Sequence, residues 1–174
     1  MYDKAPPLTG VGRTFGDHQM IVSKTDHRGI ITYANDLFLE LASMTRSEAI
    51  GAPHNCVRHP QMPRAVFKLL WDTVGAGQEI FAYVVNRSKN GDHYWVYAHV
   101  TPSFDSSGKI VGYHSNRRNP RRDALAVITP IYKLLTDEEQ RHSSAKDGIT
   151  ASTQLLHKFL ADKGTDYERF IHSV

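Results

Sequence analysis

Strand-like segments of this chain fall into two groups on either side of a helical middle, and this order most constrains the fold. Residues 20–25 and 30–34 are β-rich, and residues 80–87, 93–104 and 109–115 form the second group. Turn residues separate neighbouring segments, including the Asn90-Gly91 pair, a strong hairpin signal. Two strands, several helices and three further strands predict an α+β domain.

The segment between the two groups carries helix start signals at three places. Asn35 is a candidate N-cap for the apolar residues that follow it, and Thr45 with Glu48 forms a capping box. Pro63 suits the first turn of a longer helix with apolar residues at helical spacing over 66–74. We therefore expect short helices followed by one longer helix before the third strand.

The Asn119-Pro120 pair marks a plausible boundary. We expect a flexible Pro- and Gly-rich lead at residues 1–17, a folded domain at 18–119 and a helical extension at 120–174. Thr136 with Glu139 forms a second capping box, which predicts that a helix begins there. Apolar residues at 125–135 and 155–160 indicate two or three amphipathic helices in the extension, which need a surface to pack against.

Composition excludes several classes of protein. The 174 residues contain a single cysteine, so no internal disulfide forms, and the net charge of +3 does not argue for nucleic acid. No apolar run approaches the roughly 18 residues that span a bilayer, and the N-terminus lacks the apolar region of a signal peptide. We expect a cytoplasmic protein, and the absence of a nucleophile elbow, Walker loop or kinase signature argues against an enzyme.

Two segments of this sequence resemble a known family. Arg58-His59-Pro60-Gln61-Met62-Pro63 and residues 85–96 are similar to PAS sensor domains of the aerotaxis receptor (Aer) type, and residues 26–35 resemble a PAS opening. The similarity covers roughly residues 20–118. It implies a PAS fold, with a five-stranded antiparallel sheet and short helices on one side, before the helical extension. It also implies noncovalent binding of FAD and sensing of redox, oxygen or energy state.

The resemblance carries over to individual residues. Arg58, His59, Trp71 and Asn86 fall on positions of the family's flavin pocket or its signalling surround, and Asn35 opens the helix that borders this pocket. This chain departs from the family pattern at two positions: Gln61 stands where the family usually has Asp, and Phe81 stands where the aerotaxis receptor has Trp.

A flavin ring needs a flat apolar slot with a few polar groups aimed at its edge. Phe67, Trp71 and Tyr83 can supply aromatic walls, although Phe67 and Trp71 also fit ordinary core positions of a helix. The Asn86 amide suits the pyrimidine edge, and Arg58 can offset the pyrophosphate charge. The candidate cofactor-binding residues are Asn35, Arg58, His59, Phe67, Trp71, Tyr83 and Asn86.

Other ligands remain open at this stage. A haem needs one axial histidine, for which His59 is the first candidate and His54 or His114 are alternatives. His54, Cys56 and His59 lie close together, but no partner pair stands out that would complete a zinc site. A light-driven flavin adduct at Cys56 would need a motif that residues 55–58 only imitate.

The extension at residues 120–174 is where we expect the output to be read. The resemblance implies a signalling partner such as a chemoreceptor or histidine kinase, and we expect a homodimer. A PAS domain that binds no cofactor and serves only as an interaction module is the rival interpretation, supported by the apolar stripe at 155–160. The basic cluster Arg117, Arg118, Arg121 and Arg122 suits a solvated linker, but could also meet an acidic partner, a membrane surface or the cofactor phosphates.

Overall fold

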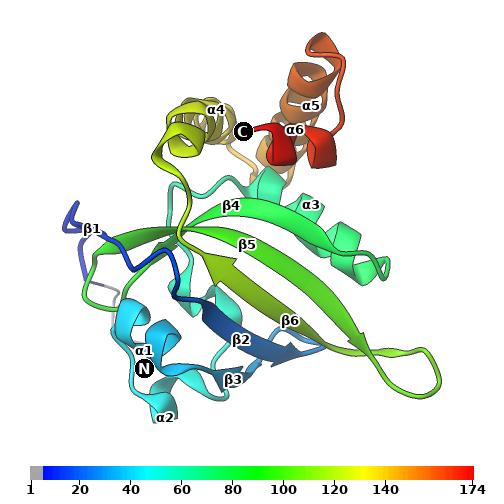
Figure 1. The fold of residues 1–174 in the computed structure, drawn as a ribbon. Coiled ribbons are helices and arrows are strands. Elements are labelled where there is room, and N and C mark those ends of the chain that lie inside the picture. Colours follow the sequence, from blue (N-terminus) through cyan, green and yellow to red (C-terminus); the bar gives the residue numbers. More distant parts are fainter. Residues whose placement is uncertain (1–5) are drawn as a thin grey trace.

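The computed structural model describes residues 6–174 and has a curled sheet at its centre (Figure 1). Its five main strands are β2 (Ile21–Asp26), β3 (Ile31–Ala34), β4 (Ile80–Arg87), β5 (His93–Phe104) and β6 (Ile110–Arg118). Neighbours in the spatial order β4-β5-β6-β2-β3 pair antiparallel. The predicted α+β architecture and the PAS arrangement of strands are confirmed.

Short helices cover one side of the sheet, called here the inner face. They are α1 (Asp36–Ala42), α2 (Arg46–Ala49), the 3-10 helix η1 (His54–Val57) and α3 (Arg64–Gly75). The Asn35 side chain caps α1, and Thr45 and Glu48 form the predicted capping box at α2. These caps pair backbone groups at the starts of α1 and α2, so both helices can stay short.

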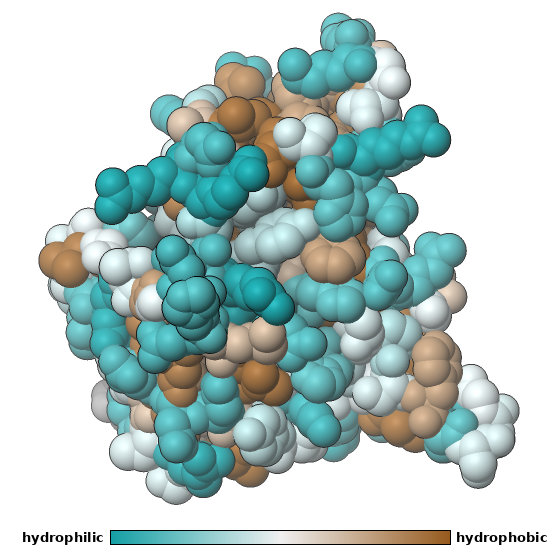
Figure 2. Space-filling model, in the orientation of Figure 1, coloured by the Kyte–Doolittle hydropathy of each residue, from teal (hydrophilic) through white to brown (hydrophobic). Residues whose placement is uncertain are grey.

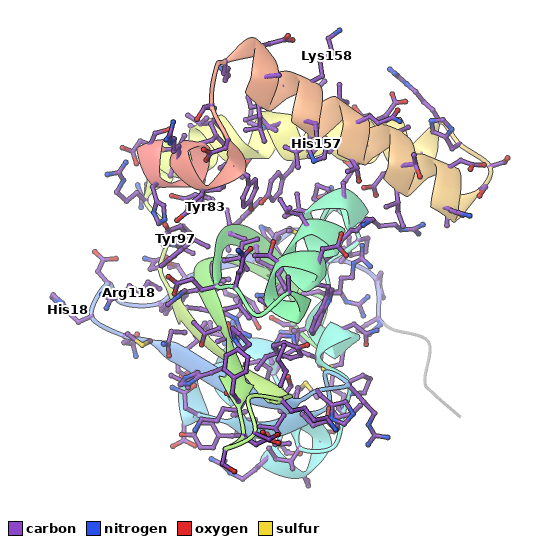
Figure 3. All side chains as sticks on the ribbon, turned by 90° about the vertical axis from the view of Figure 1, so that its right-hand side faces the viewer. His18, Tyr83, Tyr97, Arg118, His157 and Lys158 are labelled. Carbon is purple, nitrogen blue, oxygen red and sulfur yellow. The ribbon has the colours of Figure 1, made fainter. Side chains whose placement is uncertain are left out.

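Three further helices form the C-terminal tail: α4 (Arg122–Gln140), α5 (Ala145–Asp162) and α6 (Tyr167–Ser173). The tail packs on the other side of the sheet, the outer face, over β4 and β5, and continues past the β4 edge of the sheet to contact α3 (Figures 1 and 3). The Tyr132 hydroxyl of α4 donates to the Tyr83 carbonyl at 2.6 Å, and the Tyr132 ring packs 5.9 Å from that of Trp95. The tail and the sheet thus share one hydrophobic core.

The predicted helix start at Thr136 is wrong. Thr136 lies inside α4, where it is buried, and its hydroxyl donates to the carbonyls of Tyr132 and Lys133 at 3.0 and 2.9 Å. A threonine inside a helix can bond the preceding turn in this way, so the same residue spacing need not mark a helix start. Glu139 is then free to contact another helix, as described below.

The described part of the N-terminal lead contacts the sheet. β1 (Gly12–Arg13) pairs parallel with the start of β5, and the Arg13 guanidinium donates to the carbonyls of Glu40 and Leu41 at the end of α1. The flexibility of residues 1–17 stays a prediction, and residues 1–5 lie outside the described part. No helix between residues 6 and 174 is long and apolar enough to cross a membrane.

On the surface seen in Figure 2, hydrophobic residues are scattered among hydrophilic ones. Scattered exposed apolar side chains are normal for a folded domain and do not by themselves mark a binding surface. A functional site is therefore expected inside the fold rather than on this surface.

Candidate functional site

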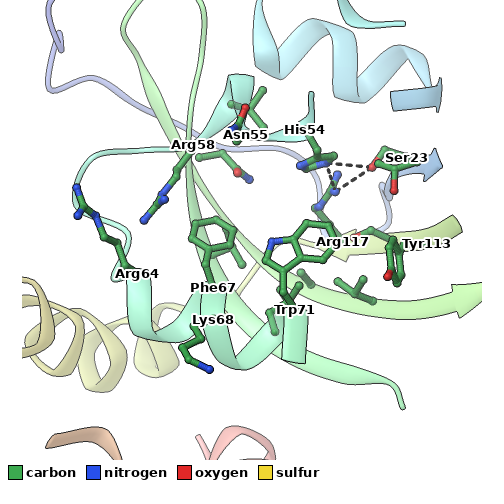
Figure 4. Close-up of a pocket in the computed structure, with 18 of the residues that line it drawn as sticks. Ser23, His54, Asn55, Arg58, Arg64, Phe67, Lys68, Trp71, Tyr113 and Arg117 are labelled. Carbon is green, nitrogen blue, oxygen red and sulfur yellow. Dashed lines mark hydrogen bonds between the residues drawn. The ribbon is translucent and has the colours of Figure 1, made fainter. Parts of the chain in front are cut away.

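A cavity of about 360 Å³ lies between the inner face of the sheet, η1 and α3 (Figure 4). Strand geometry explains which side chains reach it, because alternate residues of a strand point to the same face. Ser23 and Thr25 of β2 reach the cavity at this spacing, and so do Tyr113, Ser115 and Arg117 of β6. The complete lining comprises Ser23, Thr25, His54, Asn55, Val57, Arg58, Arg64, Phe67, Lys68, Leu70, Trp71, Val84, Asn86, Ala98, Val100, Tyr113, Ser115, Arg117 and Ile149.

Arg117 is the most unusual group of the lining. Its side chain is buried, and its Nη2 lies 2.9 Å from Ser23 Oγ and 2.7 Å from His54 Nε2 (Figure 4). Burial lowers the pKa of Arg117 to about 10, so the guanidinium stays charged at neutral pH. The cavity therefore contains a buried cation whose two side-chain partners are neutral.

His54 is uncharged beside this cation. Burial first, and the Arg117 charge second, lower the pKa of His54 to about 3. The neutral ring can accept a hydrogen bond from the Arg117 guanidinium at Nε2, which fixes its tautomer. His54 is the only histidine of the lining, and a guanidinium 2.7 Å from its Nε2 occupies the position that a haem iron would need.

The charge of the cavity has one sign. Arg58, Arg64, Lys68 and Arg117 line it, and no described Asp or Glu does. Burial lowers the pKa of Arg58, whose guanidinium lies 4.8 Å from the centre of the Phe67 ring. Lys68 forms an ion pair with Asp72 at the surface, and the Glu139 carboxylate, which lies outside the lining, acts on the Arg58 charge. An anionic or oxygen-rich ligand would complement this lining.

Two hydroxyls of the lining are buried without a hydrogen-bond partner among residues 6–174. They are Thr25 Oγ1 and Ser115 Oγ, on neighbouring strands β2 and β6. Buried polar atoms in folded proteins are nearly always paired, because an unpaired one costs about 1–3 kcal/mol. Their position beside the cavity is what a site for a polar ligand requires.

The structure brings together four of the seven candidate residues. Arg58, Phe67, Trp71 and Asn86 all line the cavity. Asn86 is buried and its backbone forms an isolated β-bridge with Arg58, so the two sides of the cavity are tied together there. Trp71 is 42% exposed and packs edge-on against Tyr113 at 5.3 Å, which places it at the mouth of the cavity.

Tyr83 lies on the outer face, so it cannot form a wall of this cavity. Its ring packs 4.8 Å from that of Tyr97, and its hydroxyl donates to the Val174 carbonyl at 3.2 Å (Figure 3). Tyr83 and Asn86 are separated by an odd number of positions in β4, and alternation therefore points them to opposite faces. Phe81 shares the outer face with Tyr83 and stacks on His99 at 4.2 Å, so its departure from the family pattern does not alter the cavity.

Asn35 and His59 also lie outside the lining. Asn35 Oδ1 accepts from the backbone N–H groups of Val22 and Phe38 at 3.0 and 3.1 Å, which joins β2 to α1. His59 is buried with its ring 5.8 Å from that of His93, and its Nδ1 accepts from the Gln61 backbone N–H. Both residues hold the elements around the cavity rather than facing into it.

The other ligand types considered from the sequence find less support in the geometry. Within residues 6–174, no three His, Cys, Asp or Glu side chains are grouped so that they could hold a metal ion. Cys56 is exposed and does not belong to the lining, although its neighbour Asn55 does.

Sequence reasoning does not identify Thr25 or Ser115 as site residues. It places Arg117 with Arg118 in a basic cluster at the domain boundary, for which the cofactor phosphates are one of several open partners. The period of two along β6 separates these neighbours, because Arg117 is buried on the inner face whereas Arg118 is exposed. That alternation, applied to residues 113–117, would have shown Arg117 on the cavity side.

Comparisons with known proteins agree with this architecture. Residues 31–117 match the family model described as PAS fold. The chain is 42% identical over 130 residues to the aerotaxis receptor of Escherichia coli (strain K12), which covers 75% of this chain and 26% of the receptor. It is 26% identical over 98 residues to a nitrogen fixation regulatory protein of Klebsiella pneumoniae, covering 56% of this chain and 20% of that protein.

Among solved structures, the light state of the blue-light photoreceptor Aureochrome1 LOV domain superposes with a TM-score of 0.55 and 25% sequence identity. That match covers 72% of this chain and 94% of the LOV chain. The chain thus spans about a quarter or less of the two curated relatives described above, but nearly all of this solved domain. With the family match over residues 31–117 and the strand order of the sheet, the chain belongs to the PAS-fold family, as a sensor domain similar to that of the aerotaxis receptor.

Proposed function

We propose that this chain is a cytoplasmic sensor that binds FAD noncovalently in the inner-face cavity and reports redox, oxygen or energy state to a signalling partner. The observation that carries the proposal is the lining of the cavity, which combines four cations, no carboxylate and two unpartnered buried hydroxyls. FAD has an oxygen-rich ring edge and a negatively charged diphosphate, and both complement such a lining.

The residues divide into three roles. Arg117, Thr25, Ser115 and Asn86 offer polar groups deep in the cavity, where the polar edge of the ring would be held. Phe67 and Val84, with other apolar lining residues, provide the flat walls that exclude water from the ring. When bound, a flavin supplies reversible electron uptake, and a new charge on it would act directly on the buried Arg117.

At the mouth of the cavity, the polar side chains are positively charged. Arg64 and Lys68 are exposed on α3, and Arg58 lies half-buried beside them. A diphosphate that leaves the cavity on this side would meet three positive charges, which supports FAD over a neutral ligand. Among the candidate residues, Arg58 has the position that agrees best with its proposed role, which is to offset the phosphate charge.

The proposed signalling partner is a chemoreceptor or histidine kinase, and the proposed assembly is a homodimer. The similarity to a receptor for aerotaxis supports this assignment, although the match spans only 26% of that receptor. No sequence or structural signature of an enzyme accompanies the cavity, so we propose a sensory rather than a catalytic role.

A visible absorption spectrum of the purified chain tests the proposal. We expect a flavin band near 450 nm, either after purification or after incubation with FAD and removal of excess cofactor. An intense haem band instead would assign the cavity to haem, and a colourless protein that binds neither FAD nor haemin would support the cofactor-free interaction module. Denaturing the protein must release the flavin into solution, since the proposal requires noncovalent binding.

A further inference from the structure

One residue of the cavity lining comes from the C-terminal tail rather than from the PAS-fold region. Ile149 of α5 lines the cavity together with five residues of α3, which are Arg64, Phe67, Lys68, Leu70 and Trp71. Helix α5 packs against both α3 and α4 (Figures 1 and 3). The region that matches the PAS-fold family ends at residue 117, so the part of the cavity wall formed by Ile149 lies outside that region.

The tail also supports the start of α3. Pro63 occupies the N-cap position of α3 and provides no side-chain hydrogen bond, and the first turn of this helix has no acidic residue. Glu139 of α4 fills this role from outside, because its Oε1 accepts from the Ala65 backbone N–H at 3.0 Å. A carboxylate at a helix N-terminus is favourable for both the hydrogen bond and the helix dipole. Glu139 therefore holds the helix that carries five of the cavity residues.

Gly148 lets α5 lie close to α4, so that Ile149 reaches the cavity while Glu139 contacts Ala65. A Cβ atom on Gly148 would lie 2.7 Å from the backbone carbonyl oxygen of Glu139, closer than real Cβ contacts. Gly148 directly precedes Ile149, so the close approach of α5 to α4 positions the residue that lines the cavity. A larger side chain at residue 148 would move α5 away from α4 and change the position of Ile149.

We propose that α4 and α5 are part of the ligand-binding site, with Ile149 as a wall residue and Glu139 as a positioning residue that acts through α3. This inference rests on the proposed function, because it requires a ligand in the cavity. Binding and tail docking must then be reciprocal: docking raises the affinity for the ligand, and the ligand stabilises the docked tail by the same factor. The tail is thereby placed to sense occupancy of the cavity directly.

The test uses three variants of the full chain and FAD as the probe. Ile149→Ala removes the wall, and Gly148→Ala opens the contact between α4 and α5. Gly75→Ala is the matched control, because this glycine lies at the end of α3 with open space around its Cβ position. Titration with FAD measures the dissociation constant, and hydrogen exchange of the backbone amides in α5 measures docking with and without FAD.

We expect the dissociation constant for FAD to rise about fivefold or more in Ile149→Ala and in Gly148→Ala, and to stay within twofold in Gly75→Ala. In the wild-type chain, we expect FAD to slow amide exchange in α5. This measurement does not depend on whether any variant folds. The inference is overturned if the wild-type chain binds FAD while α5 exchanges equally with and without it and Ile149→Ala binds as tightly as the wild type. A wild-type chain that binds no FAD overturns the proposed function itself, and this inference with it.

Discussion

Replacing Arg117 by Met should weaken FAD binding and leave the ligand-free protein at least as stable as the wild type. The pKa of Arg117 falls from 12.5 to about 10 through burial, and each unit corresponds to about 1.4 kcal/mol. Burying this charge without a ligand therefore costs on the order of 3 kcal/mol, and the cost is present at every pH below about 10. Methionine fills much of the same volume and carries no charge.

The substitution also removes two hydrogen bonds, to Ser23 and His54, which offsets part of the gain. These two side chains lie 3.3 Å apart, so Ser23 Oγ can donate to His54 Nε2 after the guanidinium is gone. We expect the free energy of unfolding of the ligand-free protein to be unchanged or to rise by up to about 2 kcal/mol. Loss of a charge-assisted hydrogen bond to FAD, worth about 1.5–3 kcal/mol, should raise the dissociation constant roughly 10- to 150-fold.

Urea unfolding of the ligand-free protein and FAD titration measure the two effects separately. Arg118→Met is the control, since it makes the same change at the next residue, which is exposed. This control should bind FAD within twofold of the wild type. The reasoning is refuted if Arg117→Met unfolds more than 1 kcal/mol more easily and still binds FAD with wild-type affinity, because Arg117 would then stabilise the fold and not hold the ligand.

Three further substitutions test the site and the fold. Trp71→Ala should raise the FAD dissociation constant about 10-fold with little change in the urea midpoint, because the ring lies at the cavity mouth and is 42% exposed. Acidification below pH 6.5 should destabilise the protein through His54, whose pKa is about 3 in the folded state. In this pH range the unfolded state binds a proton at this histidine, whereas the folded state does not. The slope from this residue is at most about 1.4 kcal/mol per pH unit, and comparison of the wild type with His54→Gln over pH 4–6.5 should show a flatter curve for the variant. Gly112→Ala should lower the free energy of unfolding by about 1–3 kcal/mol in urea titrations, since the new Cβ would lie 2.2 Å from the Thr25 carbonyl oxygen, and unchanged stability would contradict the close approach of β6 to β2.

Local chemistry made the first half of the fold predictable from the sequence. The Asn35 cap and the Thr45–Glu48 capping box depend only on side chains within three residues, and both are present in the structure. The second capping box fails as a signal of a helix start because its meaning depends on what surrounds Thr136, which is buried inside α4. A pattern of two residues cannot show whether a helix begins there or continues, since both arrangements give the hydroxyl a backbone partner.

The site was predictable where residue identity and strand alternation agree. Asn86 and Trp71 reach the cavity as proposed, whereas Tyr83 was included for its aromatic ring although its position in β4 points it to the outer face. Ile149 and Glu139 had no local signal of their role at the site, because their contacts with the cavity and with α3 join residues far apart in the sequence. Such contacts follow from how α4 and α5 pack on α3, which periodicity alone does not give.

The position of β4 between the cavity and the tail offers a second route for a signal. Val84 and Asn86 line the cavity from the inner face, whereas the backbone carbonyl of Tyr83 accepts a hydrogen bond from the Tyr132 hydroxyl of α4. A shift of β4 that follows a change at the cavity must therefore also displace the tail contact, since the backbone carbonyl of Tyr83 is itself the hydrogen-bond acceptor. Tyr132→Phe removes this hydrogen bond and leaves the Ile149 wall and the Tyr83 hydroxyl contact with Val174 intact. If α3 alone couples the cavity to the tail, FAD should protect the α5 amides of Tyr132→Phe as strongly as those of the wild type, and a loss of that protection would assign the coupling to β4.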